Sequence, residues 1–377
     1  MNKSYELFLC ASVSAMVLCG SGLAQAQIRI GQTTGLTGPV AASVNEINVG
    51  AKLYLDAVNA AGGISGQQIE LVSLDDKFEV PLAIENAKKL IADPSVVALL
   101  LNRGTPHALA LLPLLAEGRI PLIAPSTGAM ALHNPVNPWV FNVRATYQQE
   151  AEKLTRQMAL SGLDKIAFLY VNDSFGEDAA RGVLKVFKDA GQTPTVYEAI
   201  DRIKPDYTVA VQKLMAAKPL NIIIIGSPTS VSAGVKALRA AGSKATVATL
   251  SNNASSGFIK ALGETAPGVM VSQVFPSERS TALPMIAEAI RLAAARKIPA
   301  LTPAMIEGYA AAKVLVAGLK LAAKDGKEIS RAKLVRSLET FNAIDIGGLE
   351  ISYSATDHTG LDFVDVSIIN SAGTFRR

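Results

Sequence analysis

The chain has almost no cysteine. Only Cys10 and Cys19 occur among its 377 residues, and both lie in the first 26. If that segment is removed, no thiol remains, which excludes disulfides, thiolate nucleophiles and cysteine metal sites. Charge is also sparse, because charged residues make up 18% of the sequence and the formal net charge of +4 includes no block of Lys and Arg. Nucleic acid is therefore not an expected partner.

Long apolar runs are absent except near the N-terminus. A lysine precedes a mostly apolar stretch from Leu7 to Leu23, and Ala24-Gln25-Ala26 fits a signal-peptidase site. This pattern predicts a signal peptide over residues 1–26 and export of the mature, soluble protein to the periplasm. Two alternatives stay open: a membrane anchor, for which the stretch is short, and lipidation at Cys19, where Leu18 is larger than that reaction prefers.

Residues for catalysis or metal binding are scarce. The three histidines, His107, His133 and His358, are not paired at a metal-ligand spacing, and no H-E-x-x-H, G-x-S-x-G, Walker or G-x-G-x-x-G motif occurs. Asp75-Asp76 could be paired catalytic carboxylates, although turn and helix-capping acids before Pro81 explain them better. The sequence therefore predicts no enzyme, no metal site and no cofactor.

The rest of the chain alternates strand and helix patterns. Apolar runs such as Val96–Leu101 and Asn221–Ile225 predict buried strands, and segments with apolar residues at helical spacing separate them. This alternation is typical of parallel sheets covered on both faces by helices. We therefore expect an α/β fold with two similar halves, joined around residues 142–147. Ser174 and Glu177 fit a capping box at one helix start.

The last hundred residues follow a different pattern. A predicted strand over Val269–Phe275 precedes alanine-rich helical segments at about 281–296, 302–322 and 330–339, and two short strands come after them. We expect the late helices to cover the first half, so that the chain crosses between two lobes more than once. Ligands of open α/β sheets bind beyond the carboxyl ends of the strands, which places the site in the cleft between the lobes.

Hydroxyl side chains and small residues follow several predicted strands. The three groups are Gly104-Thr105-Pro106, Pro125-Ser126-Thr127-Gly128, and Thr33, Thr34, Thr37 and Ser43. Any one group could be an ordinary N-cap. Three groups at the same sheet edge predict a site for a small anion such as a carboxylate, because hydroxyls lie there beside free backbone N–H groups.

Six motifs spread along the chain form a set. They are Gly35-Leu36-Thr37-Gly38-Pro39, Asn59-Ala60-Ala61-Gly62-Gly63-Ile64-Ser65-Gly66, Asp75-Asp76 with Pro81, Ile120-Pro121-Leu122-Ile123-Ala124-Pro125, Asn172-Asp173-Ser174-Phe175-Gly176 and Ala240-Ala241-Gly242. This set resembles the periplasmic leucine/isoleucine/valine-binding family, the extracytoplasmic solute receptors of ABC importers, over essentially the whole mature chain. The resemblance implies a type I periplasmic-binding-protein fold: two Rossmann-like lobes, each a parallel sheet flanked by helices, with three hinge crossovers.

The resemblance also implies boundaries and partners. We expect an N-terminal lobe of residues 27–145 plus 277–362 and a C-terminal lobe of residues 146–276 plus 363–377. The implied partners are a small-molecule solute with a carboxylate and the membrane permease of an ABC importer, and the receptor is expected to be a monomer. A periplasmic sensor that presents its ligand-bound state to a signalling partner remains an alternative, as does a true branched-chain amino acid receptor.

The family's site positions can be transferred residue by residue. Thr105 matches the hydroxyl that holds the ligand carboxylate, and Ser126 and Thr127 match the segment that completes this grip. Ser43 stands where the first loop often has an aromatic residue, and Phe175 matches an aromatic residue that precedes a glycine.

Three further positions belong to this candidate set. Ser227 stands in place of a tyrosine, and Tyr147 begins a predicted helix. Arg103 either contacts a second carboxylate or is a solvated charge at the rim of the site.

One departure from the family pattern concerns the ligand. Amino-acid receptors commonly bind the ligand ammonium with an acid in a stretch that reads Leu250-Ser251-Asn252-Asn253 here, so that Asn252 stands at the site without a carboxylate. A buried ammonium without an acidic partner typically costs several kcal/mol. Asp173 could substitute, although a helix start explains it better. We therefore expect a small organic or aromatic acid rather than a standard α-amino acid.

Overall fold

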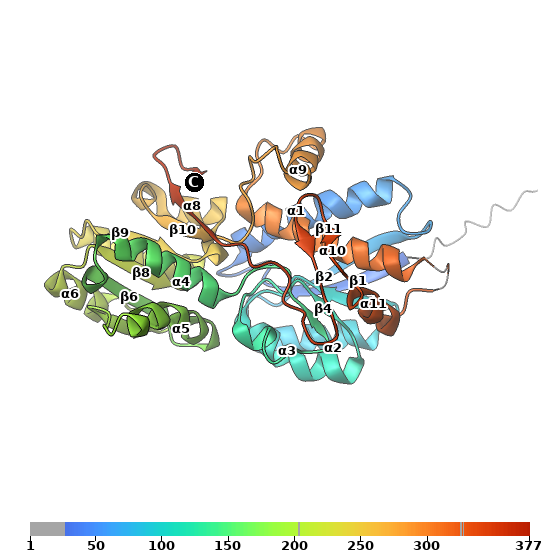
Figure 1. Ribbon diagram of the computed structural model, residues 1–377, viewed down its shortest axis with the longest axis horizontal. Coiled ribbons are helices and arrows are strands. Elements are labelled where there is room, and N and C mark those ends of the chain that lie inside the picture. The colour runs from blue at the N-terminus through green and yellow to red at the C-terminus, as the bar shows by residue number, and fades with distance from the viewer. Residues whose placement is uncertain (1–26, 203, 325, 327) are drawn as a thin grey trace, which may run out of the picture.

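The computed structural model describes residues 27–377 except 203, 325 and 327, so the predicted signal peptide lies outside the described residues. Two lobes lie side by side along the longest axis of the molecule (Figure 1). Each lobe is built on one sheet with helices on both faces. The expectation of an α/β fold with two mainly parallel sheets is confirmed.

The first lobe contains a five-stranded parallel sheet. From edge to edge its strands are β2 (Gln68–Asp75), β1 (Gln27–Thr34), β3 (Val96–Leu100), β4 (Leu122–Ile123) and β5 (Val140–Phe141). Its helices are α1 (Ala41–Ala60), α2 (Val80–Ala92), α3 (Thr105–Gly118), α9 (Pro284–Ala295), α10 (Pro303–Ala322) and α11 (Arg331–Leu338). A hairpin of β11 (Ile344–Asp345) and β12 (Glu350–Ile351) belongs to the same end of the molecule.

The second lobe contains a seven-stranded sheet. Its strands, from edge to edge, are β14 (Phe375–Arg376), β13 (Asp365–Ile369), β10 (Met270–Gln273), β9 (Thr246–Thr249), β8 (Asn221–Ile225), β6 (Ile166–Val171) and β7 (Tyr197–Ile200). Strands β6 to β10 are parallel, whereas β13 runs antiparallel to β10, and β14 antiparallel to β13. Its helices are α4 (Tyr147–Met158), α5 (Ser174–Asp189), α6 (Thr208–Ala217), α7 (Pro228–Ala240) and α8 (Ser256–Leu262).

The chain passes between the two sheets three times. It leaves the first sheet after β5, returns after β10 to form α9, α10 and α11, and crosses again between β12 and β13, where the last segment runs across the molecule in Figure 1. The predicted return of the late helices to the first half is confirmed, since α10 packs against α1 in the first core. The predicted boundaries of the lobes, between 145 and 146, 276 and 277, and 362 and 363, remain a prediction.

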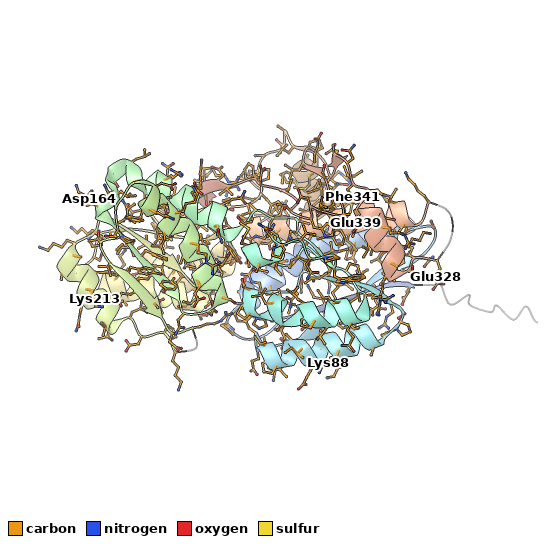
Figure 2. All side chains as sticks on the ribbon, turned by 60° about the horizontal axis from the view of Figure 1, so that its bottom comes forward. Lys88, Asp164, Lys213, Glu328, Glu339 and Phe341 are labelled. Carbon is orange, nitrogen blue, oxygen red and sulfur yellow. The ribbon has the colours of Figure 1, made fainter. Side chains whose placement is uncertain are left out.

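Successive side chains of a strand point to opposite faces of the sheet, so each strand contributes to two cores. In β8, Ile222 and Ile224 pack toward one layer of helices, and Ile223 and Ile225 pack toward the other. This is why a continuous apolar run is the signature of a strand buried on both faces. Around these cores, labelled charged side chains such as Lys88 and Lys213 point outward (Figure 2).

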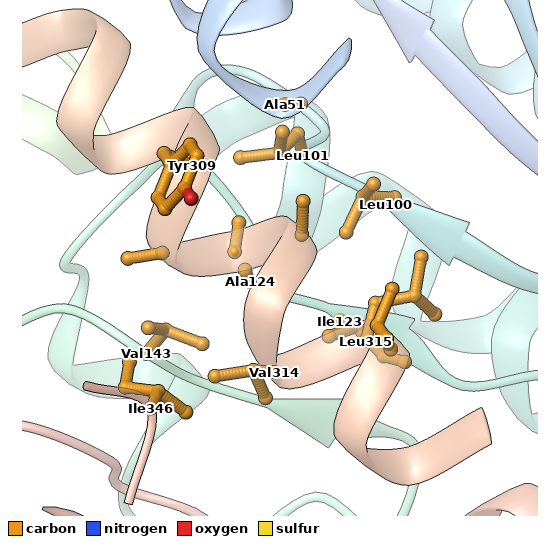
Figure 3. Close-up of a cluster of buried hydrophobic side chains, with 14 of the residues drawn as sticks. Ala51, Leu100, Leu101, Ile123, Ala124, Val143, Tyr309, Val314, Leu315 and Ile346 are labelled. Carbon is orange, nitrogen blue, oxygen red and sulfur yellow. The ribbon is translucent and has the colours of Figure 1, made fainter. Parts of the chain in front are cut away.

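Helix α10 fills the centre of the first lobe. Tyr309, Val314 and Leu315 lie among side chains of α1, β3 and β4, and Ile346 reaches the same cluster from the hairpin (Figure 3). At several buried positions of α10 the residue is alanine or glycine. These small residues let α10 approach α1 closely.

The predicted capping box of Ser174 and Glu177 is wrong. The N-cap of α5 is Asp173, whose Oδ1 accepts hydrogen bonds from the backbone N–H groups of Phe175 (2.9 Å) and Gly176 (3.0 Å). A carboxylate one residue earlier can accept both bonds, so Ser174 becomes the first helical residue. The alternative interpretation of Asp173 as a helix-start residue is confirmed.

Several short elements have no counterpart in the sequence patterns. Strands β5, β11 and β14 are two residues long, and α8 spans seven residues, too few for a period to be visible. Within the residues that the structure describes, no helix combines the length and apolarity that a membrane span requires.

Candidate functional site

A narrow cavity of about 20 Å³ lies between the lobes. From the first lobe it is lined by Val40, Phe78, Arg103, Gly104 and Thr105, and from the second by Tyr147, Val171, Phe175, Arg202, Ser227 and Asn252. Most of these residues follow the carboxyl end of a strand, where the sheet rule places ligands. The lining contains two arginines and no carboxylate.

The structure brings six of the nine predicted site residues to this cavity. They are Arg103, Thr105, Tyr147, Phe175, Ser227 and Asn252. Ser126 and Thr127 are buried behind the lining, and Thr127 Oγ1 shares a 2.7 Å hydrogen bond with Thr105 Oγ1. Ser43 is buried in the first turn of α1, where its hydroxyl donates to the carbonyl of Val40. Ser43 therefore has a helix-internal partner instead of facing the cavity.

Arg103 is not a solvated rim charge, because only 3% of it is exposed. Its Nη1 donates to Ser126 Oγ (2.8 Å), and its Nη2 donates to the main-chain carbonyl of Asn252 in the other lobe (2.8 Å). Ser126 Oγ in turn donates to Glu307 on α10 (2.6 Å). Within the described residues, no carboxylate forms a direct ion pair with Arg103.

Sequence reasoning missed Phe78 and Arg202. The Arg202 guanidinium carbon lies 4.6 Å from the centre of the Phe78 ring, and its Nη1 forms an ion pair with Asp173. Burial lowers the pKa of Arg202 to about 10, and the Arg103 guanidinium acts in the same direction, so Arg202 stays charged at neutral pH. Arg202 is the second residue after β7, so a search of every strand's carboxyl end would have found it.

A buried ion pair lies beside the first passage between the lobes. Arg144 Nη2 contacts Glu150 Oε1 and donates to Ser251 Oγ (2.6 Å), and its Nη1 lies 3.8 Å from Glu307. The other oxygen of Glu150 accepts from Ser251 N (2.9 Å) and Ser272 Oγ (2.5 Å). These bonds join residues of both lobes, and Glu307 connects them through Ser126 to Arg103 at the cavity.

Asp75 and Asp76 shape the loop that carries Phe78. Asp75 accepts from Thr37 Oγ1 (2.5 Å) and Lys77 N (2.9 Å), while buried Asp76 accepts from Thr33 Oγ1 (3.1 Å) and Phe78 N (2.8 Å). They are turn acids, as expected, although neither caps α2, whose N-cap is Glu79. The first-loop hydroxyls of Thr33 and Thr37 therefore serve these carboxylates and not an anion in the cavity.

We expect Asp76 to make the fold less stable as pH rises from about 4 to about 6. Burial raises the pKa of the Asp76 carboxyl from 3.8 to about 6, so the folded protein holds this proton more tightly than the unfolded chain. The resulting stabilisation, at most about 3 kcal/mol, is complete below pH 4 and is lost as the pH passes 6. Asp76→Asn cannot ionise, so its stability relative to wild type in urea titrations should be higher at pH 7 than at pH 4. An equal difference at both pH values would contradict this assignment.

Comparison with known proteins gives the family. The model of the periplasmic binding protein family matches residues 27–372. The Leu/Ile/Val-binding protein homolog 3 of Brucella melitensis is 26% identical over 359 residues, covering 93% of this chain and 94% of the relative. A substrate-binding periplasmic protein from Ralstonia solanacearum superposes with a TM-score of 0.84 at 29% identity, covering 93% of this chain and 99% of that chain.

A more distant structure shows the same fold. A branched-chain amino acid ABC transporter protein from Thermus thermophilus, solved with bound valine, has a TM-score of 0.80 at 18% identity and covers 93% of this chain and 95% of its own. The predicted resemblance is thus confirmed, as is the prediction of a binding protein rather than an enzyme. The chain belongs to the periplasmic binding protein family, whose members are non-enzymatic receptors that bind small solutes and work with ABC transporters, and it is homologous to Leu/Ile/Val-binding proteins over most of its length.

Proposed function

We propose that this protein is the periplasmic receptor of an ABC importer and that it captures a small organic or aromatic acid between its lobes. The observation that carries the proposal is the charge of the cavity: Arg103 and Arg202 line it, and no carboxylate does. A ligand carboxylate would meet guanidinium donors there, whereas the ammonium of an amino acid would lack an acidic partner. Export through the signal peptide at 1–26 and a monomeric state belong to the same proposal.

The walls of the cavity fit a ligand with an apolar body. Thr105 is the first residue of α3, so its hydroxyl lies beside the free amides of a helix start, which favour an anion. Tyr147 and Phe175 meet edge-on with ring centres 4.7 Å apart, and Val40 and Val171 add aliphatic surface. A carboxylate would lie at the polar side and a ring or branched chain against these side chains.

The second candidate is a branched-chain amino acid receptor. It is favoured by the name of the Brucella melitensis relative, a Leu/Ile/Val-binding protein homolog. A sensor for a signalling partner would use the same cavity and differ in what docks on the closed form, so a permease and an ATPase encoded beside the gene would favour transport.

Calorimetric titration of protein freed of ligand by unfolding and refolding tests the ligand class. Benzoate, phenylacetate and 4-methyl-2-oxovalerate should be compared with leucine, isoleucine and valine. We expect at least one of the acids to bind at least tenfold more tightly than all three amino acids. Tighter binding of leucine, isoleucine or valine than of every acid would favour the second candidate.

Thr105→Ala should weaken binding of the acid that binds best by about 10- to 100-fold, because a hydrogen bond to a charged group contributes roughly 1.5–3 kcal/mol. The fold should survive, since among the described residues the removed hydroxyl bonds only to Thr127. Thr208→Ala is the matched control, because Thr208 is the exposed first residue of α6 and does not line the cavity. Unchanged affinity in Thr105→Ala would show that Thr105 does not bind the ligand carboxylate.

A further inference from the structure

Arg202 makes a contact between the lobes at the ligand cavity. It lies in the loop after β7 in the second lobe, and its guanidinium covers the ring of Phe78, which follows β2 in the first lobe. Phe78 is itself stacked on His107, with ring centres 4.6 Å apart and 12° between the planes. A Cβ atom on Gly104 would lie 2.8 Å from the Phe78 ring and 2.9 Å from His107, so this packing requires glycine at position 104.

The Arg202 side chain is held in place but retains donors. Its ion pair with Asp173 uses Nη1, and Asp173 is fixed in turn as the N-cap of α5. Within the residues that the structure describes, the Arg202 guanidinium forms no other hydrogen bond. Its Nε and Nη2 can therefore donate to a ligand.

Arg103 faces the same cavity from the first lobe. It uses one N–H of Nη1 for Ser126 and one of Nη2 for the Asn252 carbonyl, so Nε and the remaining hydrogens are available to a ligand. Glu307 reaches this guanidinium only through the Ser126 hydroxyl, whereas Asp173 pairs directly with Arg202. Among the described residues, Arg202 therefore has a direct carboxylate partner and Arg103 has none.

Two guanidinium groups from opposite lobes repel each other at the cavity; Asp173 offsets part of this repulsion through its ion pair with Arg202, and an anion between the two groups would offset the rest. We propose that Arg202 is a ligand-contacting residue and that the acidic group of the ligand lies between Arg103 and Arg202, so that one anion joins the two lobes. This inference rests on the proposed function and adds to it the residue through which the second lobe recognises the acid.

The chemistry of the acid follows from this position. Each oxygen of a carboxylate can accept from a different guanidinium, with shorter and stronger bonds than a neutral acceptor forms. A primary amide has one acceptor oxygen, and its NH2 group would point donor hydrogens at a guanidinium. An acid should therefore bind and close the protein, whereas its amide should not.

The test uses Arg202→Gln and Arg202→Lys, with Arg156→Gln as the control on an exposed arginine of the same lobe. Benzoate, phenylacetate and 4-methyl-2-oxovalerate are titrated by calorimetry, benzamide and phenylacetamide serve as neutral analogues, and small-angle scattering reports closure as a fall in radius of gyration. Melting curves check that each variant is folded.

We expect Arg202→Gln to weaken every acid that binds by about 10- to 100-fold and to abolish compaction at saturating acid, with partial recovery in Arg202→Lys and no effect in Arg156→Gln. If acids bind and compact Arg202→Gln as they do wild type, the inference is overturned and the proposed function stands. If the amides bind as tightly as the acids, the inference is overturned, and the charge argument for the proposed function is overturned with it. If no acid binds wild type, the proposed function fails and this inference fails with it. Should Arg202→Gln not fold, Arg202→Lys decides, since affinity and compaction equal to wild type there would overturn recognition of the acid by the guanidinium donors of Arg202.

Discussion

Glu150→Ala is expected to lower the free energy of unfolding by about 3–5 kcal/mol, because it leaves the buried Arg144 guanidinium without its main partner. Both side chains are almost completely buried, and the remaining acid, Glu307, lies 3.8 Å from Arg144. Glu150 and Glu307, together with Tyr147, raise the pKa of Arg144 above its ordinary value despite burial. The variant removes the largest of these contributions, and because a guanidinium does not lose its proton in a protein, a buried charge is left without its main partner. The removed carboxylate also accepts from Ser251 and Ser272.

The control lies two residues away on the same helix. Glu152 pairs with Arg156 and Lys185, whose side chains are about half exposed, so Glu152→Ala should have a much smaller effect. Urea unfolding at pH 7 measures both variants. If Glu150→Ala lowers the free energy of unfolding no more than Glu152→Ala does, the buried pair of Arg144 and Glu150 contributes little to stability.

Gly308→Ala should be at least as damaging, with a loss of about 3 kcal/mol or more, or failure to fold. A Cβ atom at position 308 would lie 1.8 Å from the main-chain carbonyl oxygen of Ile47, and one at Gly50 would lie 1.8 Å from that of Met305. The two helix backbones thus touch at a pair of glycines, and a main-chain atom cannot move aside as a side chain can.

Gly318→Ala on the same helix is the matched control. Its Cβ would approach Leu338 Cδ2 at 2.8 Å and Leu334 Cδ1 at 3.1 Å, both at the ends of flexible side chains, so a smaller loss is expected. Thermal and urea unfolding compare the two variants. Because Gly308 follows Glu307, a folded Gly308→Ala should also bind the acid less well. Equal stability of the two variants would contradict the close backbone contact between α1 and α10.

The site illustrates how far residue patterns reach. Thr105 and Phe175 were placed by matching motifs, and the structure puts both in the lining. Arg103 was ambiguous from sequence, since an arginine beside a strand end can extend into water or fold inward. Its burial is decided by Ser126 and by the Asn252 carbonyl, 149 positions away in the chain. Arg202 belongs to no motif, and its contact with Phe78 exists only because two lobes meet.

The sequence by itself determined the alternation of strands and helices, the return of the last helices to the first lobe and the family, because periodicity and local motifs reflect burial and backbone needs within a few residues. It also indicated the lack of a carboxylate where amino-acid receptors have one. Only the tertiary structure decided which polar side chains face the ligand and which have protein partners, such as Ser126 with Glu307 across 181 positions. The reason is physical: a hydroxyl or guanidinium after a strand has several partners within reach, and packing between distant segments selects among them.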